Sequence, residues 1–395
     1  PVTIDASAMD AADTLTIHGT GAITINNLVA QLTSYATGAL TISTTAAASQ
    51  TLRFEASPTG TLTLGGAESI QLATGVDLSA LTIAGAGSYS LTLDTDAAVS
   101  MTVAQHNAAT AINAAGTTNQ ITLTTAGSLT GNAAVEAYVL ATAGGSTFTL
   151  GSASQNVTTG TGGADTLNVS TYAATGTFNT VTADTIQLGN GANISGVNAE
   201  GAGVGTALDA DNLTIDANAS VSMTVAQHNA FNGTITAAGS ETITLTTAGP
   251  ATGLAAVEAY NLAAGDQTFT LGAASQNVTT STGNITVNTG SIADITDSAI
   301  NGTSATSLAI VLGATSDISD AVITGTNGTQ DADYSITIDG FNATLTRAQN
   351  SLITSATGTN TVTLADAGPA TGNAAVETYV LATAGGSTFT LGSAS

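Results

Sequence analysis

The chain has 395 residues, with 27 acidic residues against two arginines and three histidines, and its formal net charge is −25. It lacks the basic surface that nucleic acid and anionic membranes require, and we expect neither as a partner. It has no Cys and no Lys, which excludes disulfides, thiolate metal sites, Schiff-base chemistry and P-loop phosphate binding. No apolar run approaches the about 20 residues that cross a bilayer, so no membrane insertion is expected.

Short alternations of an apolar residue, Thr and an apolar residue recur from the N-terminus onward. A period of two directs the apolar pair inward and Thr outward on a β-strand, and the Gly, Ser, Asn and Asp between the triplets predict turns. The triplets are Leu15–Ile17, Ile23–Ile25, Leu40–Ile42, Leu62–Leu64, Leu91–Leu93, Ile121–Leu123, Phe148–Leu150, Leu213–Ile215, Ile243–Leu245, Phe269–Leu271, Ile336–Ile338 and Val362–Leu364.

A longer repeat is superimposed on these strands. The phrase Thr-x-Ala-Gln ends at Gln105, Gln227 and Gln349, which are 227 − 105 = 122 and 349 − 227 = 122 residues apart. A fixed period of this length predicts a tandem array in which neighbouring units bury a shared core. We divide the chain into a partial, degenerate repeat region at 1–98, repeat units at 99–220 and 221–342, and a truncated repeat unit at 343–395. This cut, and the start at Pro1, predict a segment of a longer polypeptide.

The phrase itself has the form of a capping box, in which the Thr hydroxyl and the Gln side chain satisfy amides of a first helical turn. We therefore predict a short helical corner after Thr102, Thr224 and Thr346; a polar ligand contact by Gln is the functional alternative. The segment Asn27–Gln31 resembles the phrase but lacks Thr, so this copy is degenerate or differently capped.

Two all-β architectures fit these elements. A tandem-repeat β-solenoid (β-helix) winds coils of roughly 20 residues, whereas a string of β-sandwich domains uses about 100 residues for each. The short strands, the absence of Trp and an aromatic content of 4% favour the solenoid with short helical corners, because Ala, Val, Leu and Ile suit a narrow core.

The Thr-Val-Ala-Gln corner, the Val-Glu-x-Tyr-x-Leu strand, the Leu-Thr-Ile triplets and the excess of Ala, Thr, Gly and Ser resemble the repeat regions of bacterial surface-layer (S-layer) proteins and large RTX-type secreted surface proteins. The resemblance covers nearly the whole chain, and Gly162–Leu167 is similar to one RTX nonapeptide, although consecutive nonapeptides are missing. It implies export without a cleaved N-terminal signal, Ca²⁺ binding, and assembly into lattices, fibres or adhesins at the cell surface.

Closely spaced Asp residues next to the strands are candidate Ca²⁺ ligands, because turns of this kind supply hard oxygen ligands. The alternative is that Asp ends strands and caps turns without an ion. The candidates are Asp10, Asp13, Asp94, Asp96, Asp165, Asp209, Asp211, Asp216, Asp331, Asp333 and Asp339. A second recurring turn contains Asn in one copy, which favours turn capping over metal; its copies are Asp77–Ser79, Asn193–Ser195 and Asp317–Ser319.

Two further series are weak site candidates. His106 and His228 occupy equivalent positions where the third copy has Asn350, and isolated imidazoles are poor zinc ligands. His18 is read as a surface turn residue. The series Glu136, Glu258 and Glu377 is more typical of a solvated strand position than of a catalytic one.

We expect no enzyme, since no nucleophile elbow, P-loop or His-Glu-x-x-His motif occurs and repetition distributes the carboxylates along the chain. The favoured function is an extracellular structural protein at the bacterial cell surface that self-assembles into a surface layer or filament with calcium support. The expected partner is a second copy of the chain, and a cell-surface glycan is a further candidate. The alternative is the repetitive stalk of a large secreted adhesin.

Overall fold

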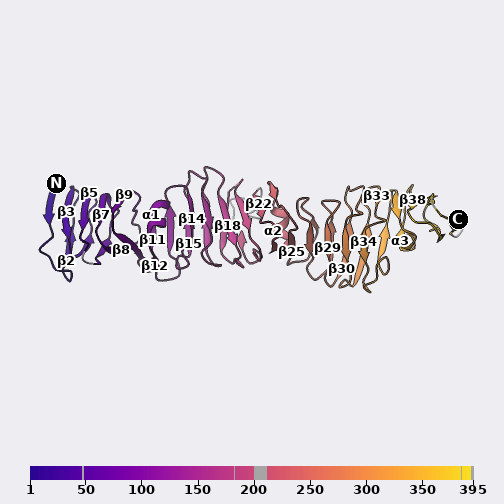
Figure 1. Ribbon diagram of the computed structural model, residues 1–395, viewed down its shortest axis with the longest axis horizontal. Coiled ribbons are helices and arrows are strands. Elements are labelled where there is room, and N and C mark those ends of the chain that lie inside the picture. The colour runs from indigo at the N-terminus through magenta and orange to yellow at the C-terminus, as the bar shows by residue number, and fades with distance from the viewer. Residues whose placement is uncertain (47–48, 182, 200–210, 384, 393–395) are drawn as a thin grey trace. The chain divides into compact units, whose positions relative to one another are not determined.

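The computed structural model describes residues 1–46, 49–181, 183–199, 211–383 and 385–392. These residues form two compact units, one built from residues 1–187 and 196–211 and the other from residues 188–195 and 212–395. In each unit the chain winds in coils, and equivalent strands of successive coils pair in parallel (Figure 1). The boundaries of the units differ from those of the sequence repeats.

Four stacks of strands make up the first unit. The first stack contains β1 (Val2–Asp5), β3 (Ile23–Leu28), β5 (Ala39–Thr44), β7 (Thr59–Leu64) and β9 (Leu81–Gly85). The second contains β2 (Thr14–Ile17), β4 (Gln31–Ser34), β6 (Thr51–Phe54), β8 (Ala67–Leu72), β10 (Ser88–Leu93) and β12 (Ile112–Ala114). The third contains β11 (Ala98–Met101), β13 (Gln120–Leu123), β15 (Ala137–Val139), β17 (Asn156–Thr158), β19 (Thr177–Asn179) and β21 (Asn198–Ala199). The fourth contains β14 (Ser128–Thr130), β16 (Thr147–Thr149), β18 (Thr166–Ser170) and β20 (Thr185–Leu188).

The second unit is built in the same way. One long stack contains β23 (Ser220–Met223), β25 (Thr242–Leu245), β27 (Ala259–Asn261), β29 (Asn277–Thr279), β31 (Ala299–Asn301) and β34 (Val322–Thr324). Another contains β26 (Ala251–Thr252), β28 (Gln267–Thr270), β30 (Asn284–Asn288), β32 (Ser307–Val311), β35 (Ser335–Thr337) and β37 (Ile353–Ser355). Shorter stacks contain β22 (Asn212–Ile215) with β24 (Ile235–Thr236), β33 (Ser316–Asp317) with β36 (Ala343–Leu345), β38 (Thr361–Leu364) and β40 (Thr378–Val380), and β39 (Pro369–Thr371) with β41 (Thr388–Thr390).

The parallel coils confirm the β-solenoid, because sandwich domains would pair their strands antiparallel. Ile25 pairs with Ile42, and Ile42 with Leu62, so these coils are 42 − 25 = 17 and 62 − 42 = 20 residues long. The three side chains are 0%, 1% and 0% exposed, because they stack on one another along the inside of the coils.

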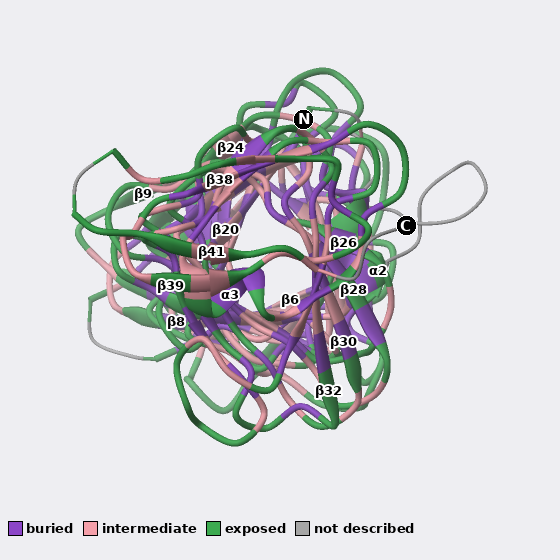
Figure 2. Cartoon of the chain, turned by 90° about the vertical axis from the view of Figure 1, so that its right-hand side faces the viewer, coloured by how far each residue is buried: buried purple, intermediate pink, exposed green. Residues whose placement is uncertain are grey.

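Burial alternates as the triplets predicted. In β5 and β13 the apolar residues are buried while the central Thr is exposed or half-buried, and Figure 2 shows buried residues on the inner faces of the coils. Burying each Leu or Ile contributes about 1.5–3 kcal/mol, so the repeated triplet is the main source of stability.

Three short helices interrupt the strands in the described part of the chain: α1 (Val103–Ala108), α2 (Val225–Ala230) and α3 (Arg347–Asn350). None of them is long and apolar enough to span a membrane. The segment Asn27–Gln31, which resembles these corners in sequence, is instead the end of β3 and the start of β4. Without the Thr cap, the Gln31 amide donates to the Asp13 carbonyl and the strand ladder continues.

Candidate functional site

The helical corners are the most elaborate sites that recur along the chain, and the predicted capping box is present in all three. In α1 the Gln105 amide donates to Thr102 Oγ1 at 3.1 Å and the Thr102 amide donates to Gln105 Oε1 at 2.8 Å. The same reciprocal pair joins Thr224 with Gln227 and Thr346 with Gln349. The corner prediction is therefore confirmed.

Each corner glutamine also bonds to the preceding coil. Gln105 Nε2 donates to the carbonyls of Leu78 and Leu81 at 2.7 and 2.8 Å. Gln227 reaches the Ile194 carbonyl at 2.7 Å and Gln349 the Ile318 carbonyl at 2.9 Å. The sequence separations are 27, 33 and 31 residues, so the same contact is rebuilt across loops of different length.

The carbonyls of Leu78, Ile194 and Ile318 belong to the second recurring turn, whose capping role is confirmed. Its first side chain accepts the amide two residues on: Asp77 from Ser79 at 2.8 Å, Asn193 from Ser195 at 2.9 Å, and Asp317 from Ser319 at 3.0 Å. The turn and the helical corner are thus joined by the side-chain hydrogen bond of the corner glutamine. Sequence reasoning missed this link; the joint recurrence of the two motifs is the signal that could have found it.

A buried histidine follows each of the first two corner glutamines. His106 Nε2 lies 3.2 Å from the Tyr138 hydroxyl, and His228 Nε2 lies 3.2 Å from the Tyr260 hydroxyl. These hydroxyls already accept the amides of Asn132 and Leu254, so they donate to the imidazoles. Burial lowers the pKa of both histidines, which keeps them neutral with the proton assigned to Nδ1.

The third copy makes the same contact with a different residue. Asn350 stands in place of His, is 3% exposed, and accepts from the Tyr379 hydroxyl through Oδ1 at 3.0 Å. The Tyr379 hydroxyl in turn accepts the Asn373 amide at 2.7 Å. What the three copies share at this position is the hydrogen bond to a tyrosine hydroxyl, and this bond does not require an imidazole.

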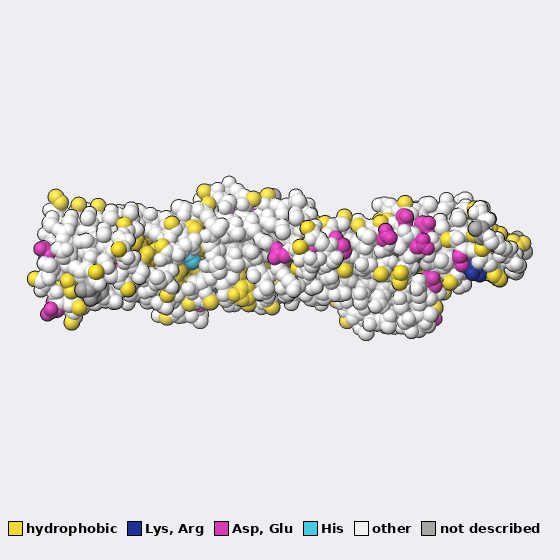
Figure 3. Space-filling model, viewed as in Figure 1, with side chains coloured by type: hydrophobic (Ala, Val, Ile, Leu, Met, Phe, Trp, Pro, Cys, Tyr) yellow, Lys and Arg dark blue, Asp and Glu magenta, His cyan; other side chains and the backbone are white. Residues whose placement is uncertain are grey.

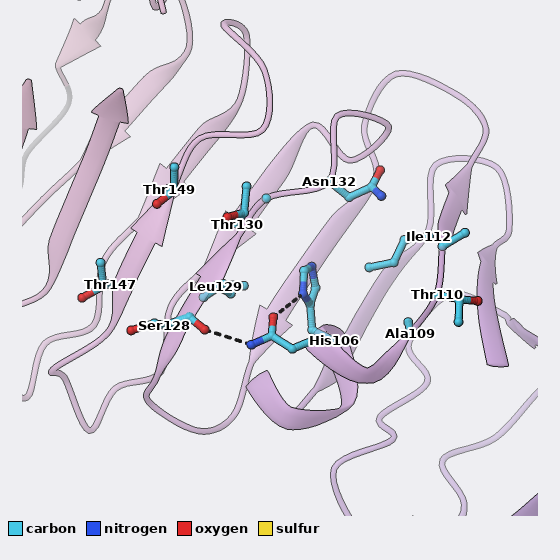
Figure 4. Close-up of a pocket in the computed structure, with 13 residues that line it drawn as sticks. His106, Ala109, Thr110, Ile112, Ser128, Leu129, Thr130, Asn132, Thr147 and Thr149 are labelled. Carbon is cyan, nitrogen blue, oxygen red and sulfur yellow. Dashed lines mark hydrogen bonds between the residues drawn. The ribbon is translucent and has the colours of Figure 1, made fainter. Parts of the chain in front are cut away.

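A groove lies beside each of the first two corners. The first measures about 600 Å³, and Figure 4 shows His106 at its centre with β14 and β16 along one side. The second, about 540 Å³, surrounds His228. Lining residues of the first include Asn107, Ile112, Ser128, Leu129, Thr130 and Thr147. Among the described residues that line either groove, the imidazole is the only titratable group, so the grooves suit neutral polar molecules.

A second feature of the first unit is a column of buried aspartates, each just before a strand. Asp165 accepts the amides of Ser146 at 2.7 Å and Gly160 at 2.8 Å. Asp184 accepts the Asp165 amide at 2.8 Å, and Asp211 accepts the Thr180 hydroxyl. Each carboxylate thereby caps a coil that precedes it in the stack.

Burial raises the pKa of two members of this column. Asp165, Asp184 and Asp211 are all 0% exposed. Desolvation raises the pKa of Asp184, and it raises the pKa of Asp211 to about 7 against the hydrogen bond from Thr180. Sequence reasoning selected Asp165 and Asp211 as calcium ligands and missed Asp184, although all three share the placement directly before an apolar strand.

The glutamate series behaves similarly and is less solvated than predicted. Glu136 and Glu258 are half-buried, and their carboxylates accept the amides of Asn119 and Glu241 at 2.9 and 3.0 Å. Glu377, which is exposed, accepts the Asn360 amide at 2.9 Å. The first two copies are thus only partly solvated, and in all three the side chain folds back over the preceding coil.

Several predicted calcium ligands act as caps of exposed turns. Asp13 accepts the Asp10 amide at 2.9 Å. Asp96, at φ 55°, accepts the amides of Thr117 and Thr118, and these bonds lower its pKa. Asp339 accepts the Ser355 hydroxyl and the Thr357 amide, both at 2.7 Å, and its pKa is also lowered.

The remaining candidates lie in different settings. Asp94 forms a bidentate ion pair with Arg53 at 2.8 and 2.7 Å, which lowers its pKa. Asp331 accepts the Tyr334 hydroxyl at 3.0 Å. Asp333 and Asp216 are exposed. Asp209 lies outside the described residues.

Within the described residues, no three His, Asp or Glu side chains come together in a group that could hold a metal ion. Calcium binding at these turns therefore stays a prediction. The surface in Figure 3 is largely uncharged, with small groups of acidic side chains. His18 is exposed, as predicted, and stacks on Tyr35 with ring centroids 4.7 Å apart.

The fold and the recurring corners define a β-solenoid repeat protein. Comparisons with family models, curated proteins and solved structures found no match.

Proposed function

We propose that the chain is a structural repeat array of the bacterial cell surface, which assembles with further copies of itself into a surface layer or filament. The carrying observation is that equivalent positions exchange chemical groups while keeping their contacts. His106 and Asn350 both receive a Tyr hydroxyl. A site used for acid–base or metal chemistry would not tolerate the exchange of His for Asn, whereas a site with a structural role tolerates it.

A second exchange supports the same proposal. The Asn107 and Asn229 amides donate to the carbonyls of Ser128 and Pro250, both at 2.9 Å. In the third copy the Pro369 carbonyl accepts from Arg347 instead, at 3.1 Å. The bond across the corner is thus maintained by an amide in two copies and, in the third, by a guanidinium from a neighbouring position of the corner.

Assembly of such copies requires cations. With 27 acidic residues against two arginines, neighbouring molecules repel each other until counterions neutralise them. Divalent calcium would bridge carboxylates that monovalent salt only screens. Calcium support therefore follows from the charge of the surface, whether or not any single turn is a dedicated site.

Light scattering after size exclusion tests the proposal. The purified chain is compared in EDTA, in millimolar Ca²⁺ and in NaCl of the same ionic strength. We expect monomers in EDTA and large assemblies in Ca²⁺ but not in matched NaCl. Monomers at high concentration under all three conditions would contradict self-assembly and would favour the adhesin stalk.

A further inference from the structure

Three pairs of residues hold successive coils together at equivalent places, just before β13, β25 and β38. They are Asn119 with Glu136, Glu241 with Glu258, and Asn360 with Glu377. In each pair the second residue lies 17 positions after the first and accepts its backbone amide, at 2.9, 3.0 and 2.9 Å. Only the middle pair consists of two acids.

The exchange of Asn for Glu removes a hydrogen-bond donor from the middle pair. In the first pair, Asn119 Nδ2 donates to Glu136 Oε2 at 3.1 Å. Glu241 Oε1 accepts the amides of Asn218 and Ala238 at 2.9 and 3.2 Å. Its Oε2 is buried and receives no donor from any described residue, although the residue is 0% exposed. Leaving a buried carboxylate oxygen without a hydrogen-bond donor destabilises the folded chain.

No cation of the protein compensates this pair. Arg53 is paired with Glu55 and Asp94, and Arg347 with Asp366. Among the described residues, the titratable groups that face the pair are the two carboxyls themselves and the Tyr260 phenol, whose pKa is raised by burial so that it stays neutral. On the preceding coil the Asn218 amide donates to Glu241 Oε1, and the acidic residue nearest to Asn218 in the sequence of that coil is Asp216.

We propose that Glu241 and Glu258 form a proton-binding site, in which the Glu258 carboxyl carries one proton taken from solvent and donates it to Glu241 Oε2. The shared proton takes the place of the donor that Asn119 Nδ2 supplies to Glu136 in the first repeat. The site makes the bond between the coils of β25 and β27 dependent on this proton.

The direction of the pKa shifts agrees with this geometry. Burial raises the pKa of Glu258; for Glu241, burial acts upward, but the Asn218 amide and the bond with Glu258 outweigh it and lower the pKa. Glu258, whose pKa is raised, stabilises the fold below its unfolded pKa and loses this effect as pH rises through its folded pKa. Glu241, whose pKa is lowered, stabilises the fold above its unfolded pKa and loses this effect as pH falls through its folded pKa. The singly protonated pair is therefore most stabilising near the unfolded pKa of Glu, about 4.3.

A carbon-13 NMR titration of glutamate side chains tests the site directly. In the wild type we expect Glu258 to titrate above, and Glu241 below, the value of about 4.3 for an unperturbed Glu. In Glu241→Gln the new amide donates at every pH, so the pKa of Glu258 should fall. The matched Asn119→Glu variant should raise the pKa of Glu136.

The wild-type titration needs no variant and can by itself overturn the proposal, if both glutamates titrate as unperturbed groups. An unchanged Glu258 titration in Glu241→Gln would do the same. The titration is repeated in EGTA and in millimolar Ca²⁺. Equal values support the shared proton, whereas a Ca²⁺-dependent fall in the pKa of Glu258 would assign the pair to a cation instead. Because this measurement follows two side chains, its outcome is independent of whether the chain self-assembles.

Discussion

The Tyr379 hydroxyl donates to Asn350 Oδ1 at 3.0 Å, in the position where Tyr138 lies 3.2 Å from His106 Nε2. The tyrosines are held in the same way, because each hydroxyl also accepts the backbone amide six residues earlier, Asn373 or Asn132. The third repeat is thus a natural substitution experiment on the first.

This relationship predicts the outcome of changing His106. His106→Asn should retain the acceptor for Tyr138, whereas His106→Ala leaves a buried hydroxyl proton without one. We expect the alanine variant to be less stable than the asparagine variant by about 1–3 kcal/mol. Urea unfolding followed by amide hydrogen exchange around α1 measures the difference, and equal losses in the two variants would show that the hydrogen bond is unimportant.

The corner glutamines should be among the most sensitive polar positions. Gln105→Leu removes the acceptor of the Thr102 amide and the side-chain donor to the carbonyls of Leu78 and Leu81. We expect a loss of at least about 2 kcal/mol and faster exchange of the amides in both coils. The control is Gln120→Leu, a half-buried residue whose side-chain bond to Thr122 is long at 3.4 Å. A control variant that loses as much stability would refute a special role of the corner.

The column of buried aspartates predicts a pH dependence of the first unit. Because the folded pKa of Asp211 is about 7 and its ordinary value is 3.8, its contribution is fully present below about 3.8 and is lost as pH rises through about 7. Asp211→Asn should therefore flatten the stability profile between these values. Melting temperatures across this range measure the effect, with Asp13→Asn, an exposed turn residue, as control. A wild-type profile that rises with pH over the same range would contradict the prediction.

The third corner contains an ion pair that the other two lack. Arg347 Nε lies 2.9 Å from Asp366 Oδ2, where the first copy has Val103 bonded through its amide to Thr125. The two charged side chains are 32% and 41% exposed, so the pair should contribute less than about 1 kcal/mol. A double-mutant cycle with Arg347→Val and Asp366→Thr measures this coupling. A coupling of several kcal/mol would mean that the pair is a main support of the corner.

Much of the architecture could be predicted from local rules. The Leu-Thr-Ile alternation at Leu40–Ile42 gave a strand with Thr outward, and the spacing from Thr102 to Gln105 gave the capped helix, because both depend on neighbouring residues. Contacts between coils could not be predicted in this way. Gln105 with Leu78, and Glu136 with Asn119, depend on loop lengths that set the register of the stack. For the same reason the buried column that contains Asp165 and Asp211 could not be predicted.

Electron microscopy of the purified chain tests the central claim most directly. If the repeats are construction elements of a surface layer or filament, images in Ca²⁺ will show sheets or fibres with one constant lateral spacing, and chelation will dissolve them. Isolated particles of a single chain in both conditions, without any regular association, would contradict the claim.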